Sequence, residues 1–219
     1  MELYHVLNRG VEKRNIFLSD GDRARFVHDL YEFNDAFPAD NDRRLSQMIE
    51  IRSQSSGGRE PIVDIHGWCL MGNHYHLLVS ERCEGGLSLF SRRLNVGYAM
   101  YFNEKYDRSG VLFQGRTKKM PITNDAYFLH ILHYIHLNPL DFLKGAGDWR
   151  DMRIANTEQA LRHLDSYRWS SYLDYCGEKN FPSIITTELF GDVFKNYRKT
   201  ISSYLKDIEL APLKPFLLE

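Results

Sequence analysis

The chain is poor in cysteine, and it has neither a long hydrophobic run nor an excess of charge of one sign. Its 219 residues include three cysteines, Cys69, Cys83 and Cys176. Such a sparse and odd set makes a poor disulfide framework, and its wide spacing does not fit a structural zinc site. No apolar run approaches the ~20 residues that cross a bilayer. We therefore expect a cytoplasmic protein without a membrane anchor.

The overall charge is close to neutral and excludes few classes of function. There are 28 Lys and Arg residues against 29 Asp and Glu residues, which gives a formal net charge of −1. Because nucleic-acid binding depends on local patches, this total neither supports nor excludes it. With 43% hydrophobic and 26% charged residues, the composition is that of a globular protein and not of a disordered or fibrous one.

Hydrophobic periodicity and turn residues predict an α+β fold. Ser19 with Asp22 resembles a capping box before the first helix, and Gly72-Asn73 marks a tight turn between two strands. The predicted order is strand, helix, strand, strand, helix, strand, helix. Strands are expected at 3–7, 62–71, 74–80 and 110–113, and helices at 19–38, 87–101 and 125–138. We interpret this order as a mostly antiparallel sheet with helices packed on its faces.

The pattern changes near residue 145, where further helical segments begin. We therefore expect a core domain over 1–145 and a helical C-terminal extension over 146–219. Within the core, residues 38–60 are polar and contain a Ser/Gly-rich stretch. This composition predicts an inserted, mobile loop.

His74 and His76 begin an apolar strand with one residue between them. Because strand side chains alternate between faces, the two imidazoles share a face and can converge on one cation, while Tyr75 packs the other way. The same pattern also fits two half-exposed histidines on an ordinary strand.

Tyr134 and Asn138 lie four residues apart, just before Pro139. Residues with this spacing share one face of a helix, so a hydroxyl and an amide would point the same way. A tyrosine beside a metal is a candidate nucleophile, although a core tyrosine gives the same pattern. His130 and His133 lie close by and could contact phosphate or orient the phenol, or could be partly buried polar residues.

A basic segment interleaved with aromatic residues follows the second predicted helix. Between Asn103 and Met120 there are five basic residues against two acidic ones, with Tyr106 and Phe113 among them. Lysine and arginine contact phosphates, and aromatic rings stack on unpaired bases. A solvated charged surface is the alternative interpretation.

Taken together, these motifs resemble those of a known family. The block 67–79, which contains Gly72-Asn-His-Tyr-His76, is similar to the HUH strand of the single-tyrosine transposases. Residues 4–10, 92–95, 108–116 and 134–139 resemble their first strand, central helix, following strand and nucleophile helix. The order and spacing match over about residues 3–140. The patch Trp169-Ser-Ser-Tyr172 is similar to that of REP-associated tyrosine transposases, although Gly72 stands where that family usually has proline.

This resemblance implies a HUH, ferredoxin-like transposase fold and a transposase activity on single-stranded DNA that carries a hairpin. Tyr134 would be the nucleophile that forms a covalent 5′-phosphotyrosine. His74, His76 and Asn138 would hold the divalent cation, Mg²⁺ or Mn²⁺. The protein would act as a monomer or homodimer and join the nucleoid when bound to DNA. The candidate DNA-binding residues are Arg9, Arg92, Arg93, Gln114, Arg116, Lys118, Lys119, His130 and His133.

Three other functions use parts of the same pattern. A replication-initiator or relaxase-type nickase would share the metal site and the tyrosine, but such proteins commonly carry long extensions. A domesticated DNA-binding protein could keep the fold without cleavage. A histidine-metal hydrolase would activate water and would not need Tyr134. A covalent adduct with DNA would separate the transposase from the last two.

Overall fold

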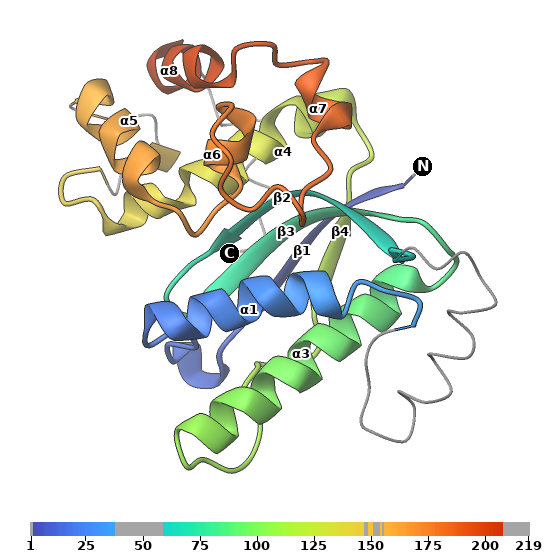
Figure 1. The fold of residues 1–219 in the computed structure, drawn as a ribbon. Helices are drawn as coiled ribbons and strands as arrows, with labels where there is room; N and C mark the ends of the chain where they lie inside the picture. The colour runs from blue at the N-terminus through green and yellow to red at the C-terminus, as the bar shows by residue number, and fades with distance from the viewer. Residues whose placement is uncertain (1, 38–58, 147–148, 151–153, 155, 208–219) are drawn as a thin grey trace.

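In the computed structural model, a four-stranded antiparallel sheet of order β2-β3-β1-β4 forms the middle layer (Figure 1). The structure describes residues 2–37, 59–146, 149–150, 154 and 156–207. All neighbouring strands are antiparallel. The strands are β1 (Leu3–Arg9), β2 (Val63–Leu70), β3 (His74–Glu81) and β4 (Lys118–Pro121).

Helices cover both faces of this sheet (Figure 1). One face carries α1 (Asp20–Glu32) and α3 (Gly86–Lys105), and the other carries α4 (Asp125–Leu137) with the C-terminal helices. The predicted α+β class, with a mostly antiparallel sheet and helices on its faces, is confirmed. The remaining helices are η1 (Val11–Lys13), η2 (Asn138–Phe142), α5 (Thr157–Ser166), α6 (Tyr172–Tyr175), α7 (Glu188–Gly191) and α8 (Tyr197–Asp207).

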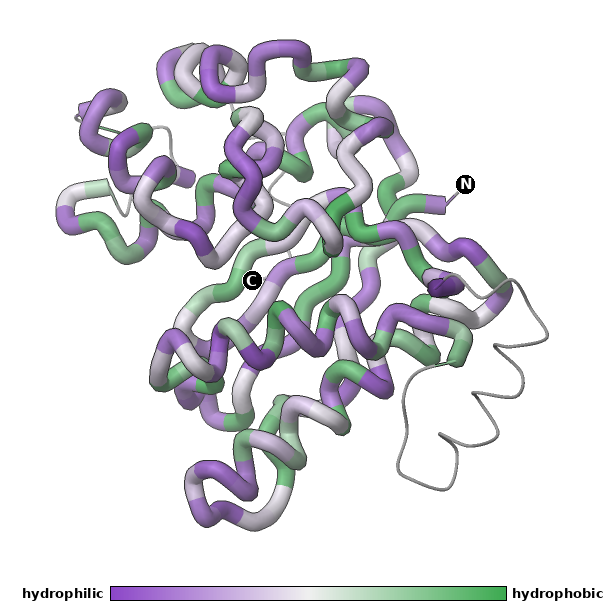
Figure 2. The backbone as a smooth tube through the Cα atoms, viewed as in Figure 1, coloured by the Kyte–Doolittle hydropathy of each residue, from purple (hydrophilic) through white to green (hydrophobic). Residues whose placement is uncertain are grey.

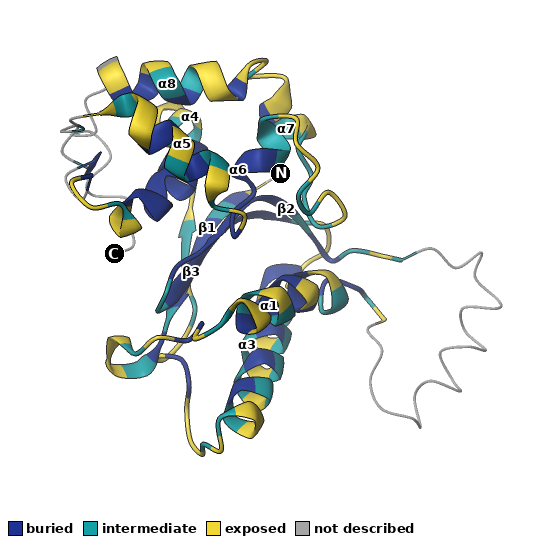
Figure 3. Ribbon diagram, turned by 60° about the vertical axis from the view of Figure 1, so that its left-hand side comes forward, coloured by how far each residue is buried: buried dark blue, intermediate teal, exposed yellow. Residues whose placement is uncertain are grey.

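The strands form the boundary between two hydrophobic cores. Leu3 and Leu78 pack with α4 and the C-terminal helices, whereas Val6, Leu77 and Val79 pack with α1 and α3. This division follows from the alternation of side chains along each strand. Figure 2 shows hydrophobic residues along the central strands, and Figure 3 shows that the strands are buried while the outer sides of α1 and α3 are exposed.

The hairpin of β2 and β3 turns at Gly72-Asn73, as predicted. The backbone N–H of Met71 donates to the carbonyl of His74 at 2.8 Å and closes the turn. The turn is also bound from outside, because the N–H of Gly10 donates to Asn73 and that of Ile16 donates to Gly72. The start of β3, where the two histidines lie, is therefore held by the segment that follows β1.

The fourth strand is not where the sequence predicted it. Residues 110–113 contribute only an isolated bridge between Phe113 and Gly10, and the strand is β4. The short segment is bounded by Gly110 and Gly115, whose φ angles are +87° and +70°. These left-handed positions bend the chain at both ends of the segment and prevent an extended ladder.

The C-terminal part of the chain closes the β2 edge of the sheet. The N–H of Leu70 donates to Trp169, that of Ser171 donates to Trp68, and that of Thr186 donates to Ile65, at 2.9, 3.0 and 2.8 Å. Most of the predicted loop at 38–60 lies outside the described residues. No helix in the described part of the chain is both long enough and apolar enough to span a membrane.

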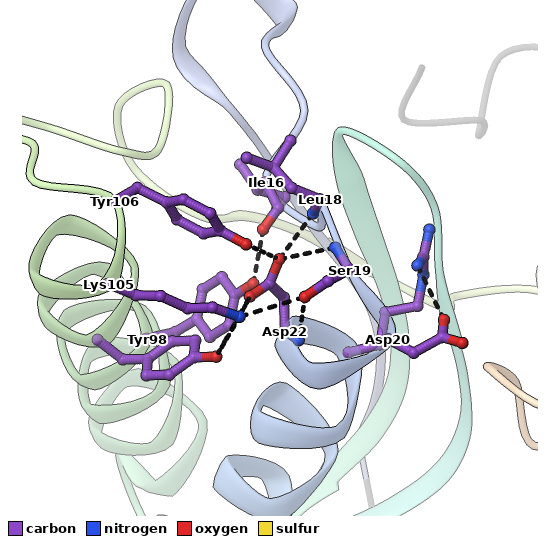
Figure 4. A network of polar contacts seen from close by, with 10 residues as sticks. Ile16, Leu18, Ser19, Asp20, Asp22, Tyr98, Lys105 and Tyr106 are labelled. Atoms are coloured by element: carbon purple, nitrogen blue, oxygen red, sulfur yellow. Dashed lines mark hydrogen bonds and ion pairs between the residues drawn. The ribbon is translucent and has the colours of Figure 1, made fainter.

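A buried carboxylate joins the start of α1 to the end of α3 (Figure 4). Asp22 completes the predicted capping box with Ser19 and accepts hydrogen bonds from the N–H groups of Leu18 and Ser19. From α3 and its C-cap residue, the Lys105 ammonium donates to Asp22 at 2.6 Å and the Tyr106 hydroxyl at 2.7 Å. Burial alone would raise the pKa of Asp22, but these hydrogen bonds outweigh it and lower the pKa.

We expect Asp22→Ala to lower the free energy of unfolding by roughly 3 kcal/mol, because it leaves buried donors of two helices without their acceptor. Urea denaturation measures the change. Glu158→Ala is the matched control, because Glu158 pairs with Arg162 at the surface, and its loss should cost under about 0.5 kcal/mol. Equal effects of the two substitutions would contradict the role of Asp22.

Candidate metal centre and nucleophile

The two histidines of β3 lie on the sheet face that α4 covers. His76 is fully buried and His74 is 7% exposed. Their ring centroids are 4.9 Å apart with the ring planes at 81°. The strand alternation that predicted a shared face therefore brings the two imidazoles together.

Each imidazole is held through its Nδ1 atom. His74 Nδ1 lies 2.6 Å from the side-chain oxygen of Asn73, and His76 Nδ1 lies 2.9 Å from Nε2 of His5. A histidine that binds a metal through one nitrogen commonly donates the other N–H to a neighbouring acceptor. If the two histidines bind a cation, this arrangement makes Nε2 of each ring the nitrogen that would coordinate it.

Tyr134 lies on α4 against His76 and His5. Its ring meets His76 edge-on, with centroids 5.8 Å apart, and lies 6.0 Å from His5. Trp149 and Arg150 lie on another side of the phenol ring, at 5.7 and 5.9 Å. The Tyr134 side chain is fully buried, and its hydroxyl oxygen is out of contact with solvent.

Asn138 lies one helical turn after Tyr134 and is bonded at both ends of its amide. Its Nδ2 donates to the carbonyl of Tyr134 at 2.8 Å, and its Oδ1 accepts from the Arg150 guanidinium at 2.8 Å. The helix was expected to continue to Asn138 and to stop at Pro139. Instead α4 ends at Leu137, and Asn138 keeps helical angles of φ −51° and ψ −37° and begins η2.

The donor set fits a divalent cation in part. In the described residues, no group of three or more His, Cys, Asp or Glu residues could hold a metal ion. The predicted set differs, because it has two imidazoles and one amide oxygen. The orientation of His74 and His76 suits coordination, whereas the oxygen of Asn138 is engaged by Arg150. A cation that bound Asn138 would have to replace that hydrogen bond.

Two of the predicted DNA-binding residues share the sheet face of the histidines. Arg9 of β1 is paired with His74, and Lys118 of β4 is paired with Leu7. Paired residues on neighbouring strands point to the same side. Gln114 is placed next to Arg9, because its N–H donates to the Arg9 carbonyl at 2.7 Å.

Other predicted DNA-binding residues lie elsewhere. Lys119 points to the opposite face, where its ammonium donates to Ser88 and burial lowers its pKa. Arg93 of α3 donates to the carbonyl of Asp35. Arg92 is exposed on α3, and Arg116 is exposed in the turn before β4.

His130 and His133 point toward the C-terminal helices rather than the sheet. The Tyr197 hydroxyl lies 3.1 Å from Nδ1 of His133 and 2.8 Å from Nδ1 of His136. His130 lies against the ring of Tyr204, with centroids 5.5 Å apart. The predicted roles of His130 and His133 toward DNA have no support in this placement.

Sequence reasoning missed three residues of this site. They are His5 of β1, which contacts His76, Tyr127 of the first turn of α4, which contacts His5, and Arg150, which contacts Asn138. His5 could have been found, because it alternates with Leu3 and Leu7 on the inward side of β1. Arg150 gives no such signal, since its contact depends on the path of the chain after η2.

Comparisons with known proteins give one weak structural similarity. No family model matches the sequence, and no curated protein matches it. The chain is similar to a solved structure of a REP-associated tyrosine transposase bound to a REP hairpin, at 12% identity and a TM-score of 0.42 over 84% of each chain. That protein is of the class that the sequence motifs resemble. Because this similarity is low, we infer the function from the chain's own residues.

The buried histidines of α4 predict a loss of stability in acid. Burial, with a smaller effect from the neighbouring charge of His130, lowers the pKa of His133 to about 3. In the unfolded chain the value is about 6.5. Between these values the unfolded chain binds a proton that the folded chain does not, so stability is full above about pH 6.5 and falls as the pH is lowered.

We expect His133→Asn, which does not titrate, to make the pH dependence of unfolding shallower by up to about 1.4 kcal/mol per pH unit. Urea denaturation at several values between pH 7 and pH 5 gives the slope. Val96→Ala, at an exposed position on α3 that carries no titratable group, is the control and should leave the slope unchanged. A slope that does not differ between wild type and His133→Asn would refute the assignment.

Proposed function

We propose that the chain is a metal-dependent tyrosine transposase that cuts and rejoins single-stranded DNA. The observation that carries this proposal is that Tyr134 lies edge-on against His76, whose ring adjoins that of His74, and one helical turn before Asn138. A hydroxyl nucleophile next to two imidazoles and an amide suits attack on a phosphate group that is bound to a cation.

In the proposed reaction, the Tyr134 oxygen attacks a DNA phosphate. A bond forms between phosphorus and the phenolic oxygen, and the bond between phosphorus and the 3′ oxygen breaks. The phenol gives up its proton, and the departing 3′ oxygen takes one. The products are a 5′-phosphotyrosine and a free 3′-hydroxyl, and attack by such a hydroxyl reverses the reaction. The covalent link keeps the energy of the phosphodiester, so no external energy source is needed.

His74, His76 and Asn138 would hold the cation, Mg²⁺ or Mn²⁺. Bound there, the cation would act as a Lewis acid on the scissile phosphate. The protein's own part is positioning. The hydrogen bonds to Asn73 and His5 fix the two imidazoles, and the bond from Asn138 to the Tyr134 carbonyl ties the amide to the helix that carries the nucleophile.

A DNA phosphate can reach Tyr134 only after a local rearrangement, because the hydroxyl is buried. Trp149 and Arg150 lie against the ring, and Arg150 also holds the Asn138 oxygen. Movement of Arg150 would release the Asn138 oxygen and would remove one of the side chains that lie near the Tyr134 ring. The released guanidinium could then contact the phosphate, since arginine binds phosphate in a bidentate manner.

Single-stranded DNA with a hairpin is the proposed substrate. Arg9 and Lys118 share the histidine face of the sheet and could contact the backbone on either side of the cleaved phosphate. Gln114 lies next to Arg9 at the end of β1, and Arg116 follows two residues later at an exposed position. The hairpin follows from the resemblance of the motifs, and the protein would act as a monomer or homodimer.

A second candidate is a domesticated DNA-binding protein that does not cleave. The hydrogen bond between Arg150 and Asn138 favours it, because a permanent bond would keep the proposed third ligand engaged. A covalent adduct with DNA separates the two candidates.

Tyr134→Phe removes only the hydroxyl, so we expect this variant to fold and to bind DNA but to lose cleavage and the covalent adduct. The measurement uses labelled single strands that carry a hairpin, with the adduct resolved by denaturing gel electrophoresis. Tyr204→Phe is the matched control. Tyr204 is a buried tyrosine of α8 that packs against His130, on the side of α4 that faces the C-terminal helices. A Tyr134→Phe protein that still forms the adduct would show that another residue is the nucleophile.

The metal site gives a graded prediction. His74→Ala and His76→Ala should each cripple cleavage, because each removes one of the two imidazole ligands. Chelation with EDTA should do the same to the wild type, because it removes the cation. Asn138→Ala should have a smaller effect, since water can replace one neutral oxygen ligand. Cleavage rates over a Mn²⁺ concentration series measure these effects. Full activity in excess EDTA would contradict the metal assignment.

A further inference from the structure

We propose that His5 and Tyr127 form a positioning relay that holds His76 in the tautomer able to bind the cation. The inference rests on the proposed function, because it concerns the second imidazole of the same site. The juxtaposition that carries it is a chain of hydrogen bonds from the Tyr127 hydroxyl through both nitrogens of His5 to His76 Nδ1.

The distances define the chain. The Tyr127 hydroxyl lies 3.1 Å from His5 Nδ1, and His5 Nε2 lies 2.9 Å from His76 Nδ1. All three side chains are fully buried. The rings of His5 and His76 are stacked, with centroids 5.2 Å apart and planes at 19°. A tilt or rotation of either ring would therefore break a contact that solvent cannot replace.

The fold brings the three residues together from separate elements. His5 on β1 is opposite Leu78 of β3, so His76 is its diagonal neighbour on the same face. Diagonal neighbours are within reach of long side chains. Tyr127 and Tyr134 are seven residues apart on α4 and so share the helix face that meets the sheet.

Proton placement gives the relay a direction. A neutral imidazole has one N–H and one acceptor nitrogen. If His76 Nε2 binds a cation, then Nδ1 carries the proton and donates it to His5 Nε2. The proton of His5 must then be on Nδ1, where the Tyr127 oxygen accepts it. Burial raises the pKa of Tyr127, so at neutral pH its hydroxyl is uncharged and can accept this bond.

The opposite direction is unsuitable for coordination. If Tyr127 donated to His5, then His5 would donate to His76, and the proton of His76 would be on Nε2. The Tyr127 hydroxyl is the acceptor that supports the N–H at His5 Nδ1 in the suitable direction. The Tyr127→Phe variant removes this support, although it changes no atom that touches the cation.

The test measures Mn²⁺ binding to the free protein, without DNA, by the electron paramagnetic resonance signal of unbound Mn²⁺. We expect His5→Leu to weaken binding by about 10- to 100-fold. Tyr127→Phe should weaken it less, and His5→Gln should bind more tightly than His5→Leu, because the glutamine oxygen can accept from His76. A purely structural role for His5 predicts no such recovery.

His66→Leu is the matched control, because His66 is also buried in the sheet but bonds Ser80 at 2.8 Å, away from the site. It should lower the melting temperature and leave Mn²⁺ affinity unchanged. If His74→Ala abolishes binding while His5→Leu binds as the wild type does, the relay is wrong and the metal site stands. If the wild type itself binds no Mn²⁺, both the metal site and the relay are wrong.

A second measurement uses the wild type and so avoids any loss of folding. Long-range ¹H–¹⁵N NMR spectra of the Mg²⁺-loaded protein distinguish the two tautomers of each histidine. We expect the proton of His5 on Nδ1 and that of His76 on Nδ1. A His5 ring protonated at Nε2 would overturn the proposal.

Discussion

The antiparallel register between β1 and β3 joins Leu3 through Arg9 to Ser80 through His74 without a bulge. Because side chains alternate, this one register sends His5, His74 and His76 to the same face. A slip of one residue in β1 would turn His5 toward α1 and α3 and would bring Val6 beneath α4. The backbone pairing of β1 with β3 thus determines which side chains share the face of the site.

Helix α4 uses two of its faces for different purposes. Tyr127 and Tyr134 meet the sheet, while His133 and His136 meet the Tyr197 hydroxyl of α8. His136 also contacts the Ser171 hydroxyl at 2.7 Å, and Ser171 is bonded to the backbone of β2. The C-terminal helices therefore fix the rotation of α4, and with it the direction in which the proposed nucleophile points.

Much of the fold could be predicted from the sequence because its signals are local. The capping box at Ser19, the turn at Gly72-Asn73 and the periodicity of α3 each depend on neighbouring residues. The same holds for the shared face of His74 and His76. The exact pairing of the last strand depends on β1, which is far away in sequence. The sequence therefore predicts this strand at 110–113, whereas β4 is Lys118–Pro121. The contacts of His5 with Tyr127 and of Arg150 with Asn138 could not be predicted for the same reason.

The two edge strands of the sheet, β2 and β4, affect how the protein behaves in concentrated solution. An unpaired strand edge is a template for pairing with another chain, and such pairing leads to aggregation. Here the backbone of Trp169, Ser171 and Thr186 bonds the β2 edge. The other edge strand, β4, is four residues long and contains two lysines and a proline. A fragment that stopped at residue 145 would keep both imidazoles and the tyrosine but would leave the eight residues of β2 uncovered. By bonding the β2 edge, the C-terminal residues thus prevent this edge from pairing with another chain.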